Sequence, residues 1–277
     1  MRKSPPPHAT PAAKADVTQS SAPGPPANSP RPVVLITGAS SGIGAEIASR
    51  LAADGRWELL LNGRDEGRLG SVAARTTGAA LPMDLASEEG CRKLAGAALA
   101  HSGRVDALVA GAGLGWAGAY TDMPPATVDR LVSVNLSAVL HLVRLVLPQM
   151  VARGSGRLVL IGSVAGRFGV RDEAVYAATK GALIAFAESL RYELRGTGVR
   201  LCLVLPGPVD TPFFTRRGTP YTRSWPRPVP AERVAAAVEK ALVGGPDEIT
   251  VPRWLAMPGR LQGMAPQLFR KLAMRFG

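Results

Sequence analysis

A buried-strand sequence that runs into a glycine-rich turn places the tightest constraint on how this chain folds. Val33-Val34-Leu35-Ile36 is an unbroken apolar run, typical of a parallel strand covered on both faces. The run stops at Thr37, and glycines follow before a helical pattern over 43–53. Such glycines allow a tight strand–helix turn and let the backbone approach a pyrophosphate at the helix N-terminus. The turn therefore predicts a dinucleotide site at Gly38, Ser40, Ser41, Gly42, Ile43 and Gly44.

The same turn has two other interpretations. A tight strand–helix turn without a ligand would use the glycines equally well. Gly38, Ser40 and Gly42 also match the GxSxG nucleophile elbow of α/β-hydrolases. We discount the hydrolase, because an elbow serine normally follows a central strand and only His101 and His141 could act as its base.

Strand and helix patterns alternate along the rest of the chain. We expect strands at 57–61, just before Asp84, and at 105–110, 157–161, 199–205 and 249–251. We expect helices from about 65, over 87–100, in two stretches within 124–151 that meet near Asn135, and over 174–196 and 231–243. This alternation predicts an α/β fold, a single doubly wound Rossmann domain with a seven-stranded parallel sheet flanked by helices.

The domain should span 32–252, between two segments of different composition. Residues 1–31 are rich in proline and lack apolar periodicity, so we expect a disordered tail. Residues 253–277 carry an amphipathic stripe at Leu261, Met264, Leu268, Leu272 and Phe276, which Pro258 and Pro266 should break into short pieces. This basic C-terminal extension could pack normally, hold an anion, touch a membrane or cover the site.

Composition removes several classes of protein. The 277 residues are 46% hydrophobic, and no apolar run approaches the roughly 18 residues of a membrane span. Two cysteines exclude a disulfide framework, and three scattered histidines make a metal site improbable, so we expect no metal and a cytoplasmic location. The net charge of +12 lies mainly in 1–31, 210–233 and 253–277, which argues against a nucleic-acid binder.

A tyrosine, a lysine and a serine form the second constellation. Tyr176 and Lys180 are four residues apart in a helical pattern, so they share one face. An ammonium near a phenol should lower the tyrosine pKa from about 10, so that the phenol exchanges a proton with a carbonyl or alcohol near neutral pH. Ser163 follows a strand end, where its hydroxyl could bind the same substrate oxygen.

The order of these residues resembles the short-chain dehydrogenase/reductase family over about 31–252. The resemblance is carried by TGxxxGxG after the first strand, Asn135, Ser163, Tyr176-Ala177-Ala178-Thr179-Lys180 and Pro206-Gly207. It implies Tyr176 as general acid/base, Ser163 as the group that orients the carbonyl, and Lys180 as a ribose ligand that lowers the tyrosine pKa. It implies that Asn135 holds a water in a proton relay. It also implies cofactor contacts at Asp84, Gly111, Pro206, Gly207, Val209 and Thr211.

One departure from the family pattern concerns the turn after the fourth strand. The family often has Asn-Asn-Ala-Gly there, whereas this chain has Ala110-Gly111-Ala112-Gly113. The two lost amides usually support cofactor binding and strand contacts. We expect backbone groups to substitute, with an altered fit to the cofactor rather than loss of binding.

The end of the second strand bears on the choice of cofactor. An acid there would bind a ribose 2′-hydroxyl and repel a 2′-phosphate. The chain has Asn62-Gly63-Arg64, and a guanidinium suits a phosphate, so we expect NADP rather than NAD. Asp65 blurs this expectation, although it could instead cap the next helix.

The substrate is the least constrained feature. Pro212-Phe213-Phe214 falls in the mobile substrate loop of the family, and Trp116, Tyr120 and Trp225 could line a pocket for an apolar or ring-bearing ketone or alcohol. An acyl-thioester or polyketide ketoreductase and a hydroxysteroid- or retinol-like dehydrogenase are versions of this function, and an epimerase or dehydratase fits the chain length less well.

A non-catalytic dinucleotide-binding sensor or scaffold is the alternative of a different class. Such proteins usually lack the tyrosine or the lysine, and both are present here. The resemblance further implies a homodimer or homotetramer, with a four-helix seam formed by 124–151 and 174–196.

Overall fold

The computed structural model describes residues 30–276, with side chains through residue 271. Most of the predicted tail at 1–31 therefore lies outside the described residues. Seven parallel strands form one sheet in the order β3-β2-β1-β4-β5-β6-β9, which confirms the predicted doubly wound Rossmann fold. Their bounds are β1 Val33–Thr37, β2 Glu58–Gly63, β3 Ala79–Pro82, β4 Ala107–Ala110, β5 Gly156–Ile161, β6 Val199–Pro206 and β9 Glu248–Val251.

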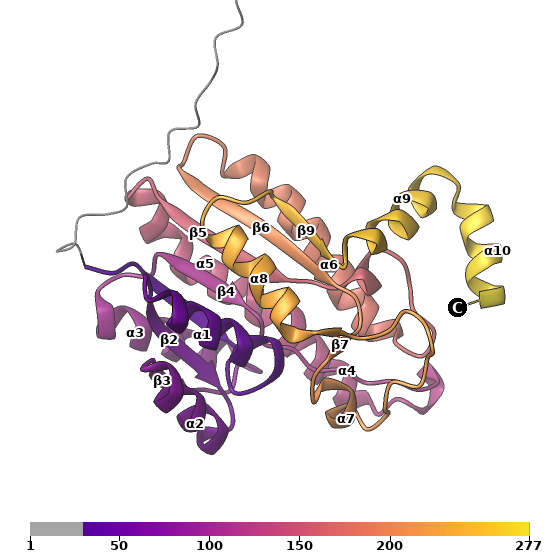
Figure 1. Ribbon diagram of the computed structural model, residues 1–277, viewed down its shortest axis with the longest axis horizontal. Coiled ribbons are helices and arrows are strands. Elements are labelled where there is room, and N and C mark those ends of the chain that lie inside the picture. The colour runs from indigo at the N-terminus through magenta and orange to yellow at the C-terminus, as the bar shows by residue number, and fades with distance from the viewer. Residues whose placement is uncertain (1–29, 277) are drawn as a thin grey trace, which may run out of the picture. The chain divides into compact units, whose positions relative to one another are not determined.

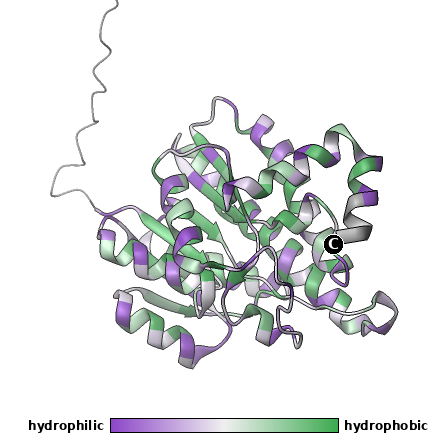
Figure 2. Cartoon of the chain, turned by 45° about the vertical axis from the view of Figure 1, so that its right-hand side comes forward, coloured by the Kyte–Doolittle hydropathy of each residue, from purple (hydrophilic) through white to green (hydrophobic). Residues whose placement is uncertain are grey.

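Helices cover both faces of this sheet (Figure 1). One core lies under α1 Gly42–Asp54, α2 Glu66–Thr76 and α8 Ala231–Leu242, where the alternate strand side chains Val34 and Ile36 are fully buried. The opposite core lies under α3 Glu88–Ser102, α5 Ala138–Ala152 and α6 Ala174–Glu193. The strands are green and the outer helical surfaces carry purple in Figure 2, as expected for a sheet buried on both sides.

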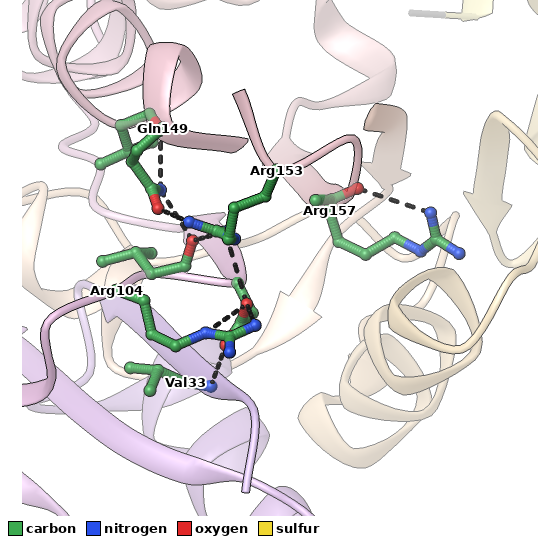
Figure 3. A network of polar contacts seen from close by, with 9 residues as sticks. Val33, Arg104, Gln149, Arg153 and Arg157 are labelled. Carbon is green, nitrogen blue, oxygen red and sulfur yellow. Dashed lines mark hydrogen bonds and ion pairs between the residues drawn. The ribbon is translucent and has the colours of Figure 1, made fainter. Parts of the chain in front are cut away.

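The amino edge of the sheet is fastened by a polar network (Figure 3). The Asp106 carboxylate, just before β4, accepts hydrogen bonds from Val33 N at 2.8 Å and from Arg104 Nε at 2.9 Å. Arg153, at the end of α5, reaches the same carboxylate at 3.4 Å and the Val105 carbonyl at 3.0 Å. Because Gln149 also donates to Val105 at 2.8 Å, β1, β4 and α5 are joined at this edge.

The helical stretch Pro125–Ala152 is long and apolar enough to cross a bilayer by length and composition. It consists of α4 Pro125–Val132, a π-helical turn Ser133–Ser137 and α5. Leu142, Val143 and Val146 of α5 are buried against the sheet, so this stretch is a core helix of the domain.

Several boundaries differ from the sequence predictions. Helix α6 ends at Glu193 rather than at 196, because Gly196 and Gly198 lie in a left-handed turn beyond it, with φ of 79° and 78°. Pro258 does not interrupt α9 Ala256–Met264, since it lies in the first turn, where no intrahelical N–H bond is needed. Pro266 begins α10 Pro266–Phe276.

A short second pairing closes the loop after β6. Strand β7 Val209–Asp210 pairs with β8 Val229–Pro230, and the intervening segment contains α7 Phe213–Arg216. The sequence patterns did not predict these elements. They hold the ends of the substrate-loop segment together.

Candidate active site

A cleft of about 1160 Å³ opens along the carboxyl ends of the strands. In this fold, the segments that follow successive parallel strands meet at one edge of the sheet. Ser163 lines the cleft. So does every residue that the sequence analysis assigned to the cofactor: Gly38, Ser40, Ser41, Gly42, Ile43, Gly44, Arg64, Asp84, Gly111, Tyr176, Lys180, Pro206, Gly207, Val209 and Thr211.

The glycine turn forms the floor of one end of the cleft. Gly38 has φ of +72°, and a Cβ there would lie 2.8 Å from Ala112 Cα, so only glycine fits. Ser41 is the N-cap residue of α1 but makes no side-chain capping bond. Its hydroxyl instead accepts a hydrogen bond from Arg216 Nη1 at 2.6 Å. The first N–H groups of α1 therefore have no side-chain acceptor at this N-cap.

The end of β2 combines a structural amide with exposed cations. Buried Asn62 donates to the Leu81 and Met83 carbonyls at 3.0 and 3.2 Å, which ties β2 to β3. Arg64 is exposed and lines the cleft. Asp65 caps α2 by accepting from Arg68 N at 2.9 Å, which confirms the capping interpretation of this acid.

Asp84 follows β3 and faces the cleft. Burial alone would raise its pKa, but hydrogen bonds from Arg130 and from Ala86 N, together with the charge of Arg64, lower the pKa overall. The Arg130–Asp84 contact is 2.7 Å. Asp84 therefore stays an ionised acceptor, and Arg130 is a cleft residue that the sequence patterns did not reveal.

The altered turn at Ala110–Gly113 is held by backbone groups. The buried Thr37 hydroxyl accepts hydrogen bonds from Gly111 N at 3.0 Å and from Ala112 N at 3.1 Å. These bonds join the end of β1 directly to the turn after β4. The turn is thus ordered without the amide side chains usual in the family.

A close backbone approach brings together the residues predicted for acid–base chemistry. Ser163 follows β5 and caps the 3₁₀ turn Val164–Gly166, accepting from Ala165 N at 3.1 Å. A Cβ at Gly166 would lie 2.5 Å from the Lys180 carbonyl carbon, so this glycine lets α6 pack directly on the turn. As a result Ser163, Tyr176 and Lys180 line the same wall of the cleft.

The electrostatics of Tyr176 differ from the sequence prediction. Burial raises its pKa to about 12, and a hydrogen bond with Ser163 opposes this only in part. Lys180 does not lower it in this structure. The lysine Nζ lies 5.8 Å from the ring centroid and donates to the Ile161 carbonyl at 2.9 Å, and burial lowers its own pKa to about 8. The expected lowering of the Tyr176 pKa by Lys180 is therefore wrong here, because desolvation is the largest effect on this pKa and the lysine contributes no opposing one.

Asn135 is fully buried in the π-helical turn and does not line the cleft. Its amide exchanges hydrogen bonds with the Leu114 backbone, accepting from N at 2.7 Å and donating to O at 2.9 Å. A side chain at Gly113 would lie 3.5 Å from Asn135 Oδ1 and 3.8 Å from Lys180 Nζ. The amide and the ammonium thus border one small space.

The substrate loop supplies aromatic residues to the other end of the cleft. The Phe213 ring lies 5.7 Å from the Tyr176 ring, and Phe214 packs on Tyr221 at 4.9 Å. The largely buried Arg217 pairs with Glu173 at 2.5 Å and covers the Phe214 ring at 4.7 Å. This ion pair fixes the loop to the start of α6, and no sequence motif signalled it.

The aromatic residues proposed for the pocket divide into two groups. Phe213, Phe214 and Trp225 line the cleft. Trp116 and Tyr120 do not: Trp116 packs on Gly118, and Tyr120 is 64% exposed in a 3₁₀ turn. The prediction that these two residues line the pocket is therefore wrong for this cleft.

The cleft fits a nicotinamide dinucleotide. The cradle at Gly38 excludes any Cβ, the α1 N-terminus has no side-chain cap, and the arginines beside it offer charge for phosphate. Tyr176 and Lys180 lie on the wall of the same cleft, and its volume suits a dinucleotide together with a small substrate.

Comparison with known proteins gives a consistent result. The family model described as short chain dehydrogenase matches residues 32–221. A ketoacyl reductase of Nostoc sp. is 34% identical over 225 residues, covering 79% of this chain and 77% of the relative. Human 17-beta-hydroxysteroid dehydrogenase type 1 is 37% identical over 194 residues, covering 67% of this chain and 59% of the relative.

Solved structures show the same fold with bound nicotinamide cofactors. A short-chain dehydrogenase from Sphingobium yanoikuyae in complex with NADPH superposes with a TM-score of 0.74 at 31% identity, covering 85% of this chain and 95% of that one. A short chain dehydrogenase/reductase from Burkholderia phymatum in complex with NAD gives 0.77 at 26% identity, covering 86% and 95%.

Proposed function

This chain belongs to the short-chain dehydrogenase/reductase family, and on that premise we propose that it interconverts a carbonyl and an alcohol on an apolar or ring-bearing substrate with NADP(H). One observation carries the proposal: Ser163, Tyr176 and Lys180 line the same cleft as the glycine cradle. That arrangement suits proton transfer beside a nicotinamide.

The protonation states support the reductive direction. A tyrosine whose pKa is about 12 is protonated at neutral pH, so Tyr176 donates a proton to the carbonyl oxygen. NADPH, which the glycine turn with Tyr176 and Lys180 would hold in this cleft, would supply the hydride for the carbonyl carbon. Ser163, on the same wall of the cleft, orients the same oxygen. We assign Lys180 and Asn135 to a relay that returns a proton toward Tyr176 through a water held by Asn135, and the closeness of both groups to Gly113 supports this assignment.

Three cations support a preference for NADP over NAD. Arg64, Arg68 and Arg216 all line the cleft, and Arg216 donates a hydrogen bond to Ser41 at the glycine turn. The pKa of Arg216 is lowered, first by burial and then by the charge of Arg68, while Asp65 opposes this. A 2′-phosphate at this point would relieve the repulsion among the guanidinium groups, whereas a 2′-hydroxyl would not.

The substrate end of the cleft favours an apolar compound. Phe213, Phe214 and Trp225 present aromatic surface near Tyr176. The human relative is named for a hydroxysteroid and the Nostoc relative for a ketoacyl group. The second name keeps an acyl-thioester or polyketide ketoreductase as the alternative substrate class.

The quaternary structure and the location of the protein are also proposals. Helices α5 and α6 expose Val151 at 40% and Tyr192 at 72%, which supports the homodimer or homotetramer inferred from the family. A cytoplasmic location stays a prediction.

The substitution Tyr176→Phe tests the function. We expect ketone reduction to fall by roughly 10³-fold, within the range of acid–base catalysis, while NADPH affinity is retained because the ring stays in place. Cofactor binding is measured by quenching of tryptophan fluorescence, and turnover by NADPH consumption across a panel of cyclic and aryl ketones. Undiminished turnover in the variant would refute the role of Tyr176, and cofactor binding without any turnover in the parent protein would favour the non-catalytic sensor.

A further inference from the structure

Exposed apolar side chains gather at one place on this protein. Among the described residues, eleven large hydrophobic side chains are exposed, and six of them lie in Trp225 and the segment 254–268. Met264 is 87% exposed, Trp225 66% and Met257 61%. A soluble surface usually scatters such residues singly. We call this set the C-terminal patch: Trp225, Trp254, Met257, Leu261, Met264 and Leu268.

The C-terminal patch is strongly basic. Residues 253–277 contain five cationic side chains and no acid. Four of them, Arg253, Arg260, Arg270 and Lys271, lie where side chains are described, and none of these forms an ion pair with a described residue. The patch therefore carries uncompensated positive charge beside exposed apolar surface.

The patch is anchored to the body of the domain and reaches the cleft. Trp225 stacks on Trp254 with ring centroids 4.7 Å apart, which joins the substrate loop to the segment before α9. Phe269 of α10 packs on Phe168 at 5.8 Å. Trp225 and Phe269 also line the cleft, so the patch borders its substrate end. In Figure 1, α9 and α10 stand out beside the sheet rather than over it.

The chemistry of the patch selects its occupant. A second copy of this face is disfavoured, because a twofold contact would set a segment of five cations against itself. Anionic lipid satisfies both features: the arginine and lysine heads meet phosphate groups, while tryptophan, methionine and leucine enter the boundary with the acyl chains. An acidic protein would match the charge but leaves the apolar side chains without a specific partner.

We propose that the C-terminal patch binds the surface of a membrane containing anionic lipid and places the substrate end of the cleft against it. Helices α9 and α10 lie in the interface without crossing the bilayer. A membrane-dissolved substrate then enters past Trp225. This last consequence rests on the proposed function, whereas membrane binding itself does not.

Vesicle flotation with the full chain tests the proposal. We expect binding to vesicles of phosphatidylcholine mixed with phosphatidylglycerol, weak binding to phosphatidylcholine alone, and loss of binding as salt rises. The double variant Met264→Glu, Leu268→Glu should partition at least about tenfold less, because it places charge in the apolar surface. Neither residue lines the cleft. The matched control is Val243→Glu, which alters a 53% exposed side chain outside the patch and should bind as the parent does.

Several results would overturn the proposal. The parent protein could fail to bind either kind of vesicle, or the double variant and the control could lose vesicle binding equally. Light scattering could also show self-association of the parent that only the double variant abolishes. Capture of a purified acidic carrier protein in place of lipid would likewise overturn it. Circular dichroism establishes that the variants fold, and NADPH binding measured on the same samples separates failure of the patch from failure of the proposed function.

Discussion

The two edges of the sheet handle polar groups in opposite ways. At the amino edge, the Asp106 carboxylate is 12% exposed and is engaged by Val33, Arg104 and Arg153 (Figure 3). At the carboxyl edge, the α1 N-terminus lacks a side-chain cap, Tyr176 is desolvated, and Lys180 is buried with a carbonyl as its partner. The amino edge is satisfied by its own side chains, and the carboxyl edge is built to be completed by a ligand.

The comparison of the two edges separates the polar groups that stabilise the fold from those that serve its function. Buried groups that are paired stabilise the fold, whereas buried groups that lack ionic partners cost stability and are retained for chemistry. Substitutions at the two edges should therefore change stability in opposite directions.

Removing the carboxylate at the amino edge should destabilise the protein without changing its site. We expect Asp106→Ala to lower the free energy of unfolding by about 3 kcal/mol, on the order of 100-fold in the unfolding constant, because buried donors lose their acceptor. Urea denaturation measures the loss, and NADPH affinity of the folded variant should stay unchanged. A parallel loss of affinity would show that the two edges are not independent.

Removing the buried cation at the carboxyl edge should instead stabilise the fold and abolish turnover. Burial lowers the pKa of Lys180 to about 8, so below that pH the folded protein carries a desolvated charge that the unfolded chain hydrates. Lys180→Met should raise the free energy of unfolding at pH 7 by roughly 1–3 kcal/mol while abolishing turnover.

The pH dependence of this gain has a definite sign. Between pH 8 and the ordinary lysine pKa of about 10.5, the unfolded chain binds more protons than the folded one, so the stability of the parent rises with pH. The difference in the free energy of unfolding between the parent protein and Lys180→Met should therefore decrease from pH 7 to pH 10. A gap that stays constant would mean that the gain comes from packing and not from the charge.

Arg216 on the substrate loop should increase the preference for NADPH over NADH. We expect Arg216→Ala to weaken NADPH binding roughly tenfold and NADH binding by less than about twofold, because only NADPH carries the 2′-phosphate. Arg64→Ala should act in the same direction. Titration with 2′,5′-ADP and with 5′-AMP isolates this end of the cofactor, and Arg75→Ala, outside the cleft, is the control. Equal effects on both nucleotides would contradict the assignment.

Local patterns identified the glycine turn and the Ser163–Tyr176–Lys180 wall of the cleft. The glycine turn, the Tyr176–Lys180 pair and the loops after β2, β3 and β6 were identifiable because each depends on backbone geometry within a few residues. Arg216 and Arg217 were not, since their partners Ser41 and Glu173 lie far away in the chain. The same holds for Thr37, whose hydroxyl supports the turn at Gly111.

Hydrophobic periodicity and glycine positions act locally, so the sequence alone was enough to predict a doubly wound Rossmann domain with seven parallel strands, its glycine turn, and the cleft-lining residues Ser163, Tyr176 and Lys180. The fold was needed to establish the pKa shifts of Tyr176 and Lys180, the absence of Trp116 and Tyr120 from the cleft lining, and the gathering of the C-terminal patch beside Trp225. Desolvation and long-range contacts set these properties, and both depend on which segments the fold brings together.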